Sequence, residues 1–418
     1  MTIASGVEKK LVLAPQATKG TEAIQALGTA QFLRRVTSNL DMTKETYESN
    51  EINANRQMAD MRHGVQSVEG TLNGELSAGT YDLLMAALLR KDFVAGVTSG
   101  VNADVTTAVT SGAAGTFTSA ATATFLTDGF KVGDVVRCTG HSGGDATNNN
   151  DHNCMITAVT ELIMTGYMLD GQPFVADAAG DDIDITVVGK KTWVPETAHT
   201  EDWFTLEHNF SDLDLSETFW DVKINTMAFK VPATGMSTID IGLMGLNHTN
   251  KEAGESPWFT SVVAASTGGV LASVDGAIFV GGAQIALITS IDFDIAGGLT
   301  SEPVVGSNVK PDIFDGRVTV KGTMTVFFQD ATMRDYFEDE TEVAVNLAIT
   351  DNDDADAEFI AASMPRVKMG GASKDDGEKG IVQTMPFVAL FNTTGGDETG
   401  ASATDELATT ISIQDSTL

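Results

Sequence analysis

The sequence predicts a mainly β protein with two tandem β-sandwich domains, each with a short flanking helix, and a small β-domain inserted into the first. The 418-residue chain is long enough for two or three domains. Its 41 glycines and 9 prolines, together with recurring Thr and Val, favour strands joined by turns. A stretch of alternating apolar and polar residues that changes to helical spacing occurs twice, beginning at Gly64 and at Gly316.

The two copies align without a gap over roughly fifty residues when the chain is shifted by 252 positions (316 − 64 = 252). Gly70 then coincides with Gly322. Other matched pairs are Val36 with Ile288, Ser49 with Ser301, and Asp60 with Asp312. A repeat of this length is a unit of architecture, so we infer an internal duplication.

The first part of each copy has the pattern of a strand with one buried face, because its apolar residues recur with a period of two. The residues of this face are Val68, Gly70, Leu72, Gly74 and Leu76 in the first copy, and Val320, Gly322, Met324, Val326 and Phe328 in the second.

A helix is predicted after each of these strands. Tyr81, Leu84, Met85 and Leu88 have helical spacing. Met333, Tyr336 and Phe337 occupy the positions equivalent to the first three of these residues. Thr80 and Thr332 stand at equivalent helix starts, where a hydroxyl can cap the first turn.

These patterns divide the chain into an N-terminal arm, two sandwich domains, an insert and a linker. The arm covers 1–27, the first domain 28–95 and 196–255, the insert 96–195, the linker 256–280 and the second domain 281–418. The insert has short strands with turn signals and should form its own core. The residues predicted for that core are Phe125, Phe130, Val135, Ile156, Val159 and Ile185.

The net charge of −33 argues against a conventional DNA-binding protein, because an acidic surface repels phosphates. The N-terminus lacks the apolar core of a signal peptide, and no uncharged apolar run is long enough to span a membrane. Two cysteines do not make a disulfide scaffold. We therefore expect synthesis in a reducing cytoplasm.

Cys138, His141, His152 and Cys154 are the residues whose types could suit zinc, but their spacing matches no common finger. A disulfide across a hairpin is a second interpretation of the cysteines. Two free thiols in a polar hairpin is the third, and we favour it. We expect no catalytic, cofactor-binding or metal-binding residues and no cofactor.

The carboxylates of Asp351–Glu358 are predicted to form a solvated acidic turn, since an EF-hand loop would need a glycine that is missing there. Trp258 is our candidate for a contact between subunits. The sequence has no G-x-S-x-G or H-E-x-x-H motif and no paired nucleophile and base, so we predict that the protein is not an enzyme.

The series RRVTSN, YESNEI, NRQMADMRHG and VEGTLNGELSAGTYDLLMAALL resembles the tail tube proteins of long-tailed, siphovirus-type bacteriophages. The second copy, with DIFDGRVTVKGTMTVFF and MPFVALF, resembles the same domain more loosely. The resemblance leaves out the insert. It implies a major tail tube protein, a virion component whose β-sandwich domains join into stacked rings around the lumen that conducts DNA during ejection. The implied partners are other copies of the chain, the tape measure protein, tail terminator and tail tip proteins, and DNA passing through without specific binding. Membrane contact is not implied, and assembly would take place in the host cytoplasm.

The resemblance also implies a ring: where a single-domain tube protein would form a hexamer, two copies of the domain in one chain would let a homotrimer present six quasi-equivalent domains. Met1–Gln25 is expected to become ordered only when rings stack. The insert is expected to decorate the outer wall on flexible connections, so that replacing Ala95–Pro195 with a linker leaves assembly intact. A secreted surface-layer protein is the alternative, which would need a secretion signal. An enzyme on a two-domain β scaffold is a further alternative, which would need convergent catalytic groups.

Overall fold

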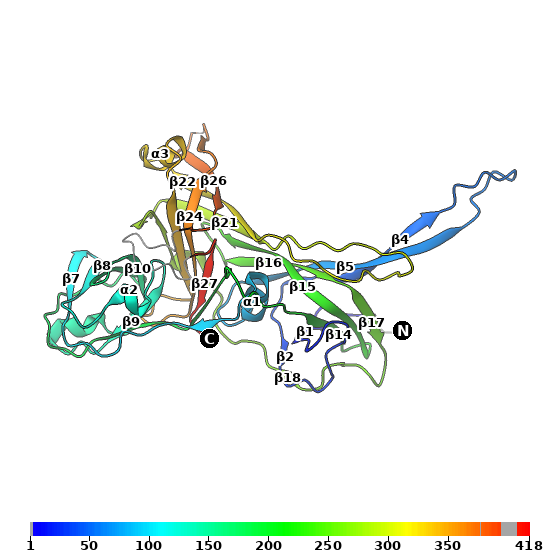
Figure 1. The fold of residues 1–418 in the computed structure, drawn as a ribbon, viewed down its shortest axis with the longest axis horizontal. Coiled ribbons are helices and arrows are strands. Elements are labelled where there is room, and N and C mark those ends of the chain that lie inside the picture. Colours follow the sequence, from blue (N-terminus) through cyan, green and yellow to red (C-terminus); the bar gives the residue numbers. More distant parts are fainter. Residues whose placement is uncertain (1–2, 377, 394–407) are drawn as a thin grey trace.

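The computed structural model describes residues 3–376, 378–393 and 408–418. It is mainly β, as predicted, and elongated, with a hairpin projecting from one end and a compact sheet at the other (Figure 1). Strands before the insert are β1 (Lys9–Pro15), β2 (Ala30–Phe32), β3 (Thr37–Ser38), β4 (Asp41–Glu48), β5 (Met61–Glu75) and β6 (Val94–Ala95), with helix α1 (Asp82–Leu89) before β6. The next group is β7 (Val105–Ser111), β8 (Ala114–Ser119), α2 (Phe125–Asp128), β9 (Val135–Thr139), β10 (Cys154–Val159), β11 (Ile163–Met168) and β12 (Asp184–Val187).

The remaining elements complete the large sheet system. They are β13 (Lys190–Trp193), β14 (Phe204–Phe210), β15 (Leu215–Val231), β16 (Thr238–Gly245), β17 (Asn247–Lys251), β18 (Val262–Val263), β19 (Gly276–Val280), β20 (Ala283–Gln284), β21 (Ile288–Ala296), β22 (Thr319–Phe327), α3 (Thr332–Glu338), β23 (Val343–Thr350), β24 (Phe359–Met369), β25 (Ser373–Lys374), β26 (Val382–Ala389) and β27 (Ser412–Asp415).

The first half of the body consists of two sheets that share the long strand β15. The N-terminal part of β15 pairs with β14 and β17, and β1 pairs with β14. The C-terminal part of β15 pairs with β16, which continues to β5 and then to β3 and β4. One strand can serve both sheets because it changes partners between Trp220 and Lys223.

The second half repeats this order of strands. β24 pairs with β23 and β27 along its first part, and β19 pairs with β23. The end of β24 pairs with β26, which continues to β22 and β21. Both halves have a register shift at the equivalent point, between Phe204 and Leu206 in β14 and between Val343 and Val345 in β23.

The alternation predicted for β5 and β22 is confirmed at most positions, although Gly70 and Gly322 are only half-buried. Val68, Leu72 and Gly74 are buried in β5, as are Val320, Met324 and Val326 in β22. Phe328 lies beyond the end of β22 and is 37% exposed, so its placement on the buried face was wrong.

Helix α1 packs its apolar side against the buried face of the first half. Leu84, Met85 and Leu88 are buried, as is Tyr81, which lies so close to Gly74 that a Cβ there would collide with the phenol oxygen. The predicted threonine caps are wrong. Thr80 bonds Ser77 through its hydroxyl, the helix begins after Tyr81 without a side-chain cap, and Thr332 lies inside α3.

The N-terminal segment is largely part of the fold, contrary to the expectation that Met1–Gln25 orders only on stacking. β1 pairs along its whole length with β14, and Leu11, Val12 and Leu13 are buried. The segment is ordered despite its lysines because the apolar residues 11–14 (LVLA) are buried and their backbone pairs with the edge of β14. Met1 and Thr2 lie outside the described residues.

β7 to β12 form a separate six-stranded sheet in the order β12-β9-β10-β11-β8-β7. Phe125, Phe130, Ile156 and Ile185 are buried in its core, and Val159 packs against that core. Val135 was assigned there wrongly. It belongs to a different cluster, shared with the second half, whose other buried members are Met155, Ala277, Phe279, Ala348, Phe359 and Ala361.

The six-stranded sheet is therefore docked on the body and does not hang on flexible connections. The Gln414 side chain accepts a hydrogen bond from Val135 N and donates to Val135 O and Val188 O, at 2.9, 2.8 and 2.7 Å. Asp134 and Lys191 form a buried ion pair of 2.7 Å between the insert and β13. β13 itself, although within 96–195, pairs with β6 and β27 of the large sheet system.

The stability of the protein should depend on pH because of His208 on β14. Burial, with the positive charges of Lys9 and Arg35 and the neighbouring His248, lowers the pKa of His208 to about 3. The unfolded chain, with an ordinary pKa of about 6.5, therefore takes up this proton first. The loss of free energy of unfolding caused by His208 is absent above pH ~6.5, grows as the pH falls and is complete below pH ~3.

We expect this residue to remove about 2 kcal/mol of the free energy of unfolding between pH 7.5 and pH 5. Urea unfolding of the wild type and of His208→Gln at both pH values measures it, since other titrating groups cancel in the comparison. Equal losses in the two proteins would contradict the assignment.

Candidate assembly interface

The two halves join edge to edge through β15 and β21. Six antiparallel residue pairs form this junction, from Thr226 with Ala296 to Val231 with Ile291. The Phe229 and Phe293 rings stack across it, with centroids 4.7 Å apart and an interplanar angle of 12°. The order β4-β5-β16-β15-β21-β22-β26-β24 is thus one continuous sheet through both halves.

One face of this continuous sheet is apolar and covered. Buried side chains alternate on it through Ile241, Met227, Phe229, Phe293 and Met324. They belong to one large cluster that includes residues of both halves and of α1. The covered face therefore supplies much of the protein's apolar core.

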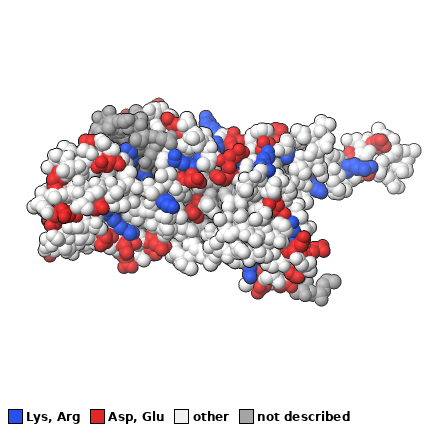
Figure 2. All heavy atoms as spheres, turned by 60° about the horizontal axis from the view of Figure 1, so that its bottom comes forward, with Lys and Arg blue, Asp and Glu red and all other residues white. Residues whose placement is uncertain are grey.

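The opposite face is polar and carries charges of both signs with an acidic excess. Asp240, Lys230, Asp292 and Asp294 lie on it around the junction. The hydrogen bond to Asp240 raises the pKa of Lys230, and partial burial raises the pKa of Asp292. Over the face of the molecule in Figure 2, basic side chains are scattered in small groups among acidic ones.

Each end of the continuous sheet presents a strand edge without a partner among the described residues. β3 and β4 pair with β5 alone. At the other end, β25 pairs with β26 alone. By the strand order of the two halves, β25 occupies the place of the part of β15 that pairs with β21. Open edges of this kind are templates for pairing with another chain.

The hairpin β4–β5 projects far from the body (Figure 1). Several of its apolar side chains are exposed: Tyr47 is 53% exposed, Ile52 100%, Met58 60% and Met61 49%. Beyond the paired strands, Ser49 N donates a hydrogen bond of 2.9 Å to Asp60 O on the opposite side of the hairpin.

The corresponding connection of the second half, residues 297–318, is instead folded onto the first half. Figure 1 shows it, in yellow, running along β5. Leu299 and Ile313 are buried in a cluster with Trp203 and Leu246. Gln66 N donates to Asn308 O at 2.8 Å. Ion pairs join Asp312 to Lys19 at 2.6 Å and Asp315 to Lys223 at 3.1 Å.

An open groove of about 530 Å³ lies at the start of β22 and the end of β26. Its wall includes Arg317, Val318, Val388, Leu390 and Phe391. Phe391 is 44% exposed. This is a large surface recess next to apolar side chains of the second half.

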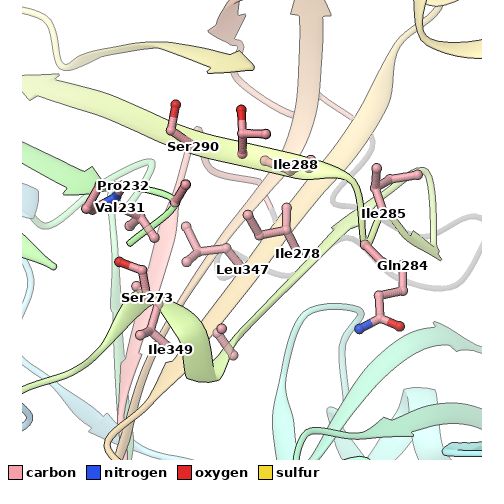
Figure 3. Close-up of a pocket in the computed structure, with 15 residues that line it drawn as sticks. Val231, Pro232, Ser273, Ile278, Gln284, Ile285, Ile288, Ser290, Leu347 and Ile349 are labelled. Carbon is pink, nitrogen blue, oxygen red and sulfur yellow. The ribbon is translucent and has the colours of Figure 1, made fainter. Parts of the chain in front are cut away.

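A smaller cavity, of about 110 Å³, lies between β21 and the β19–β23 pair. Figure 3 shows Ile278 and Leu347 side by side beneath the strand that carries Ile288 and Ser290. Pockets for small molecules usually measure about 300–1,000 Å³. This cavity is therefore a packing space of the second half.

The structure does not bring the four candidate zinc ligands together. His141 bonds Asp177 at 2.7 Å, and His152 bonds Asp170 at 2.5 Å. Cys138 and Cys154 are free thiols, but they are buried in the core of the six-stranded sheet and not in a polar hairpin. Burial raises the pKa of Cys138 to about 12 and that of Cys154 well above its usual value.

His141 forms a different cluster, with Asp177 and Asp181, whose possible ligand atoms lie within 4.8 Å of one another. The Asp181 carboxylate already accepts two bonds of 2.6 Å, from Ser142 N and Ser142 Oγ. We interpret the cluster as a set of hydrogen bonds that close the loop after β9.

The acidic turn and Trp258 both have contacts that the sequence did not indicate. Half of the residues of the turn are exposed, and two of its carbonyls accept hydrogen bonds from the insert, Asn153 N to Ala355 O and Arg137 Nη2 to Asp356 O, both 2.9 Å. Trp258 lies against its own chain, where Lys251 Nζ is 3.7 Å from the ring centroid and Ala23 O accepts from Nε1.

Glu207 holds the turn that contains Trp258. It is fully buried, and its carboxylate accepts hydrogen bonds from Ser216 Oγ, Trp258 N and Phe259 N at 2.6, 2.7 and 3.1 Å. The position of Trp258 is thereby explained by contacts within one chain, and a subunit contact is not needed to account for it.

None of the described helices is long and apolar enough to cross a membrane. No curated protein matches the chain. A family described as "Phage tail tube protein" matches residues 6–389, a span that includes the insert, which the resemblance of the repeats had left out. The match extends over most of the 418 residues and agrees with the β-rich fold and the open strand edges. The chain belongs to the phage tail tube protein family and is a structural component of the virion tail.

Proposed function

We propose that this protein is the major tail tube protein of a siphovirus-type phage, and that three subunits close head to tail into a ring with pseudo-sixfold symmetry. The observation that carries the proposal is the β15–β21 junction. It pairs the end of the first half with the start of the second. The same pairing between β25 of one subunit and β3–β4 of the next would extend the sheet from chain to chain. Head-to-tail contacts that close in this way make rings, and a closed barrel has no free edge.

The equivalent order of strands in the two halves supports two tube domains in one chain. In this proposal the domains keep the boundaries expected from the sequence, except that β1 joins the first domain, β19 joins the second, and β13 belongs to the large sheet system instead of the insert. Each ring then contains six domains from three chains, and stacked rings form the tube.

The polar face of the continuous sheet lines the lumen in this proposal, because the other face is covered by the protein's own core. Asp240, Asp292 and Asp294 give it acidic groups, with Lys230 among them. Acidic groups keep DNA phosphates from adhering, so DNA and the tape measure protein pass without specific binding during ejection. The insert lies on the outer wall, three per ring, and terminator and tip proteins bind the two ends of the tube.

The test is the mass and symmetry of a single ring. Mass measurement of isolated rings together with averaged end-on views of tubes should give three copies and six similar densities around the lumen. Six copies in one ring, or flat sheets in place of tubes, would overturn the proposal.

A further inference from the structure

We propose that the projecting hairpin of one copy docks into the groove formed by the start of β22 and the end of β26 in a second copy. This inference rests on the proposed ring, and it assigns the side chains that complete the contact between subunits. The same kind of contact already exists inside one chain, where the connection 297–318 of the second half packs on the first half.

The docked connection and the projecting hairpin are equivalent segments. The 252-residue shift places Leu299 on Tyr47 and Ile313 on Met61 (299 − 252 = 47; 313 − 252 = 61). Leu299 is 8% exposed and Ile313 is 2% exposed, whereas Tyr47 and Met61 are about half exposed. The same two positions are thus covered where a receiving surface is present and open where it is not.

The receiving surfaces are equivalent as well. Leu243 of β16 pairs with Gly70, and Phe387 of β26 pairs with Gly322, which is the residue that the repeat aligns with Gly70. Residues of β16 and β26 therefore correspond with a shift of 144 (387 − 243 = 144), which places Leu246 on Leu390.

Leu246 is only 4% exposed, because Leu299 and Ile313 of the connection 297–318 pack against it. Leu390, at the equivalent position, lines the open groove of about 530 Å³ beside Val388 and Phe391. The groove is thus the second-half equivalent of the surface on which the first half holds the connection 297–318, and no segment of the described residues fills it.

The charges of the two surfaces are complementary. Over residues 41–62 the hairpin is acidic on balance, with five exposed carboxylates (Asp41, Glu45, Glu48, Glu51 and Asp60) and three exposed basic side chains (Lys44, Arg56 and Arg62). Arg317 and Lys321 are exposed at the groove. Opposite charges at the rim of an interface guide association and set its register. The hairpin of a second copy of this chain therefore matches the groove in apolar character and in the sign of its charge excess.

A cysteine pair tests the contact directly. Met61→Cys and Leu390→Cys, combined in one chain, should form disulfides between copies in assembled tubes under mild oxidation, giving linked species up to the closed ring on non-reducing gels. The native Cys138 and Cys154 are each about 1% exposed and should not interfere. Ile52→Cys with Leu390→Cys is the matched control. It places the thiol at the exposed end of the hairpin, away from the paired strands, and should link far less.

A second pair of changes tests the energetics without cysteines. Tyr47→Asp with Met61→Asp should raise the protein concentration needed for tube formation by roughly tenfold or more, since two apolar side chains at the centre of a contact are lost. Both positions are exposed in the single chain, so circular dichroism and thermal unfolding of the subunit should not change.

The outcomes separate the docking from the ring. Tubes that form normally from both variants, without cross-links between positions 61 and 390 of the cysteine variant, would overturn the docking and leave the proposed function standing. Wild-type protein that never forms tubes would count against the proposed function itself, and the docking would fail with it.

Discussion

Replacing Glu207 with alanine should lower the free energy of unfolding by about 3–5 kcal/mol, because it leaves buried donors without an acceptor. The carboxylate accepts from Ser216 Oγ, Trp258 N and Phe259 N, and none of its surface is exposed. Each buried donor left unsatisfied costs about 1–3 kcal/mol, and two of these donors are backbone groups that cannot turn away.

Urea unfolding measured by tryptophan fluorescence checks this value. Glu207→Gln retains one carbonyl oxygen and should lose less than the alanine variant. Glu338→Ala, which breaks an exposed ion pair with Arg334 on α3, is the matched control and should cost under about 1 kcal/mol. An alanine variant at position 207 as stable as this control would refute the assigned role.

Deleting the insert should destabilise the body, because the insert buries residues of the body. The sequence had predicted that this burial is internal to the insert and that its removal leaves assembly intact. Val97–Val187 can be replaced by a short Gly/Ser turn, since Ala95 and Lys190 are paired neighbours and β6 and β13 remain. The deletion uncovers Phe279 and Phe359, which lie against Val135 and Met155 of the insert. Exposing two such aromatic side chains costs roughly 3–6 kcal/mol.

The deletion variant should therefore unfold at lower urea concentration and bind an apolar dye more strongly than the full chain. Phe279→Ser in the deletion background should reduce the dye binding without restoring stability. If the variant keeps the stability of the full chain and binds no more dye, the insert is an independent attachment after all.

The repeated strands and α1 were predictable because their signals are local. In β5 and β22 one face is buried, so apolar and polar residues alternate along the chain. Leu84, Met85 and Leu88 have helical spacing and lie on one side of α1. Helix caps were not predictable, since the hydroxyl of Thr80 had a nearer partner in Ser77.

Contacts between segments far apart in the chain could not be predicted from the sequence, for a physical reason. Val135 is apolar whether it faces its own domain or another, so its pattern cannot tell which of the two it packs against. β1 was underestimated because its partner, β14, lies far along the chain. The open edges and the groove were equally hidden, since alternation describes the faces of a strand and says nothing about which edge lacks a neighbour.

The β15–β21 junction also has a kinetic consequence. It forms when the chain folds, at an effective concentration set by the connecting polypeptide and independent of the amount of protein present. In the proposed ring, half of the junctions are therefore already made before any two subunits meet. Closure then needs three junctions between chains where separate domains would need six, so fewer chains must meet and the rate should depend less steeply on concentration. Once the tube stands, a subunit can leave only by breaking its contacts with other chains, because the junction inside each chain is held by the polypeptide itself. The loss of material at the tube ends should therefore remove two domains at a time.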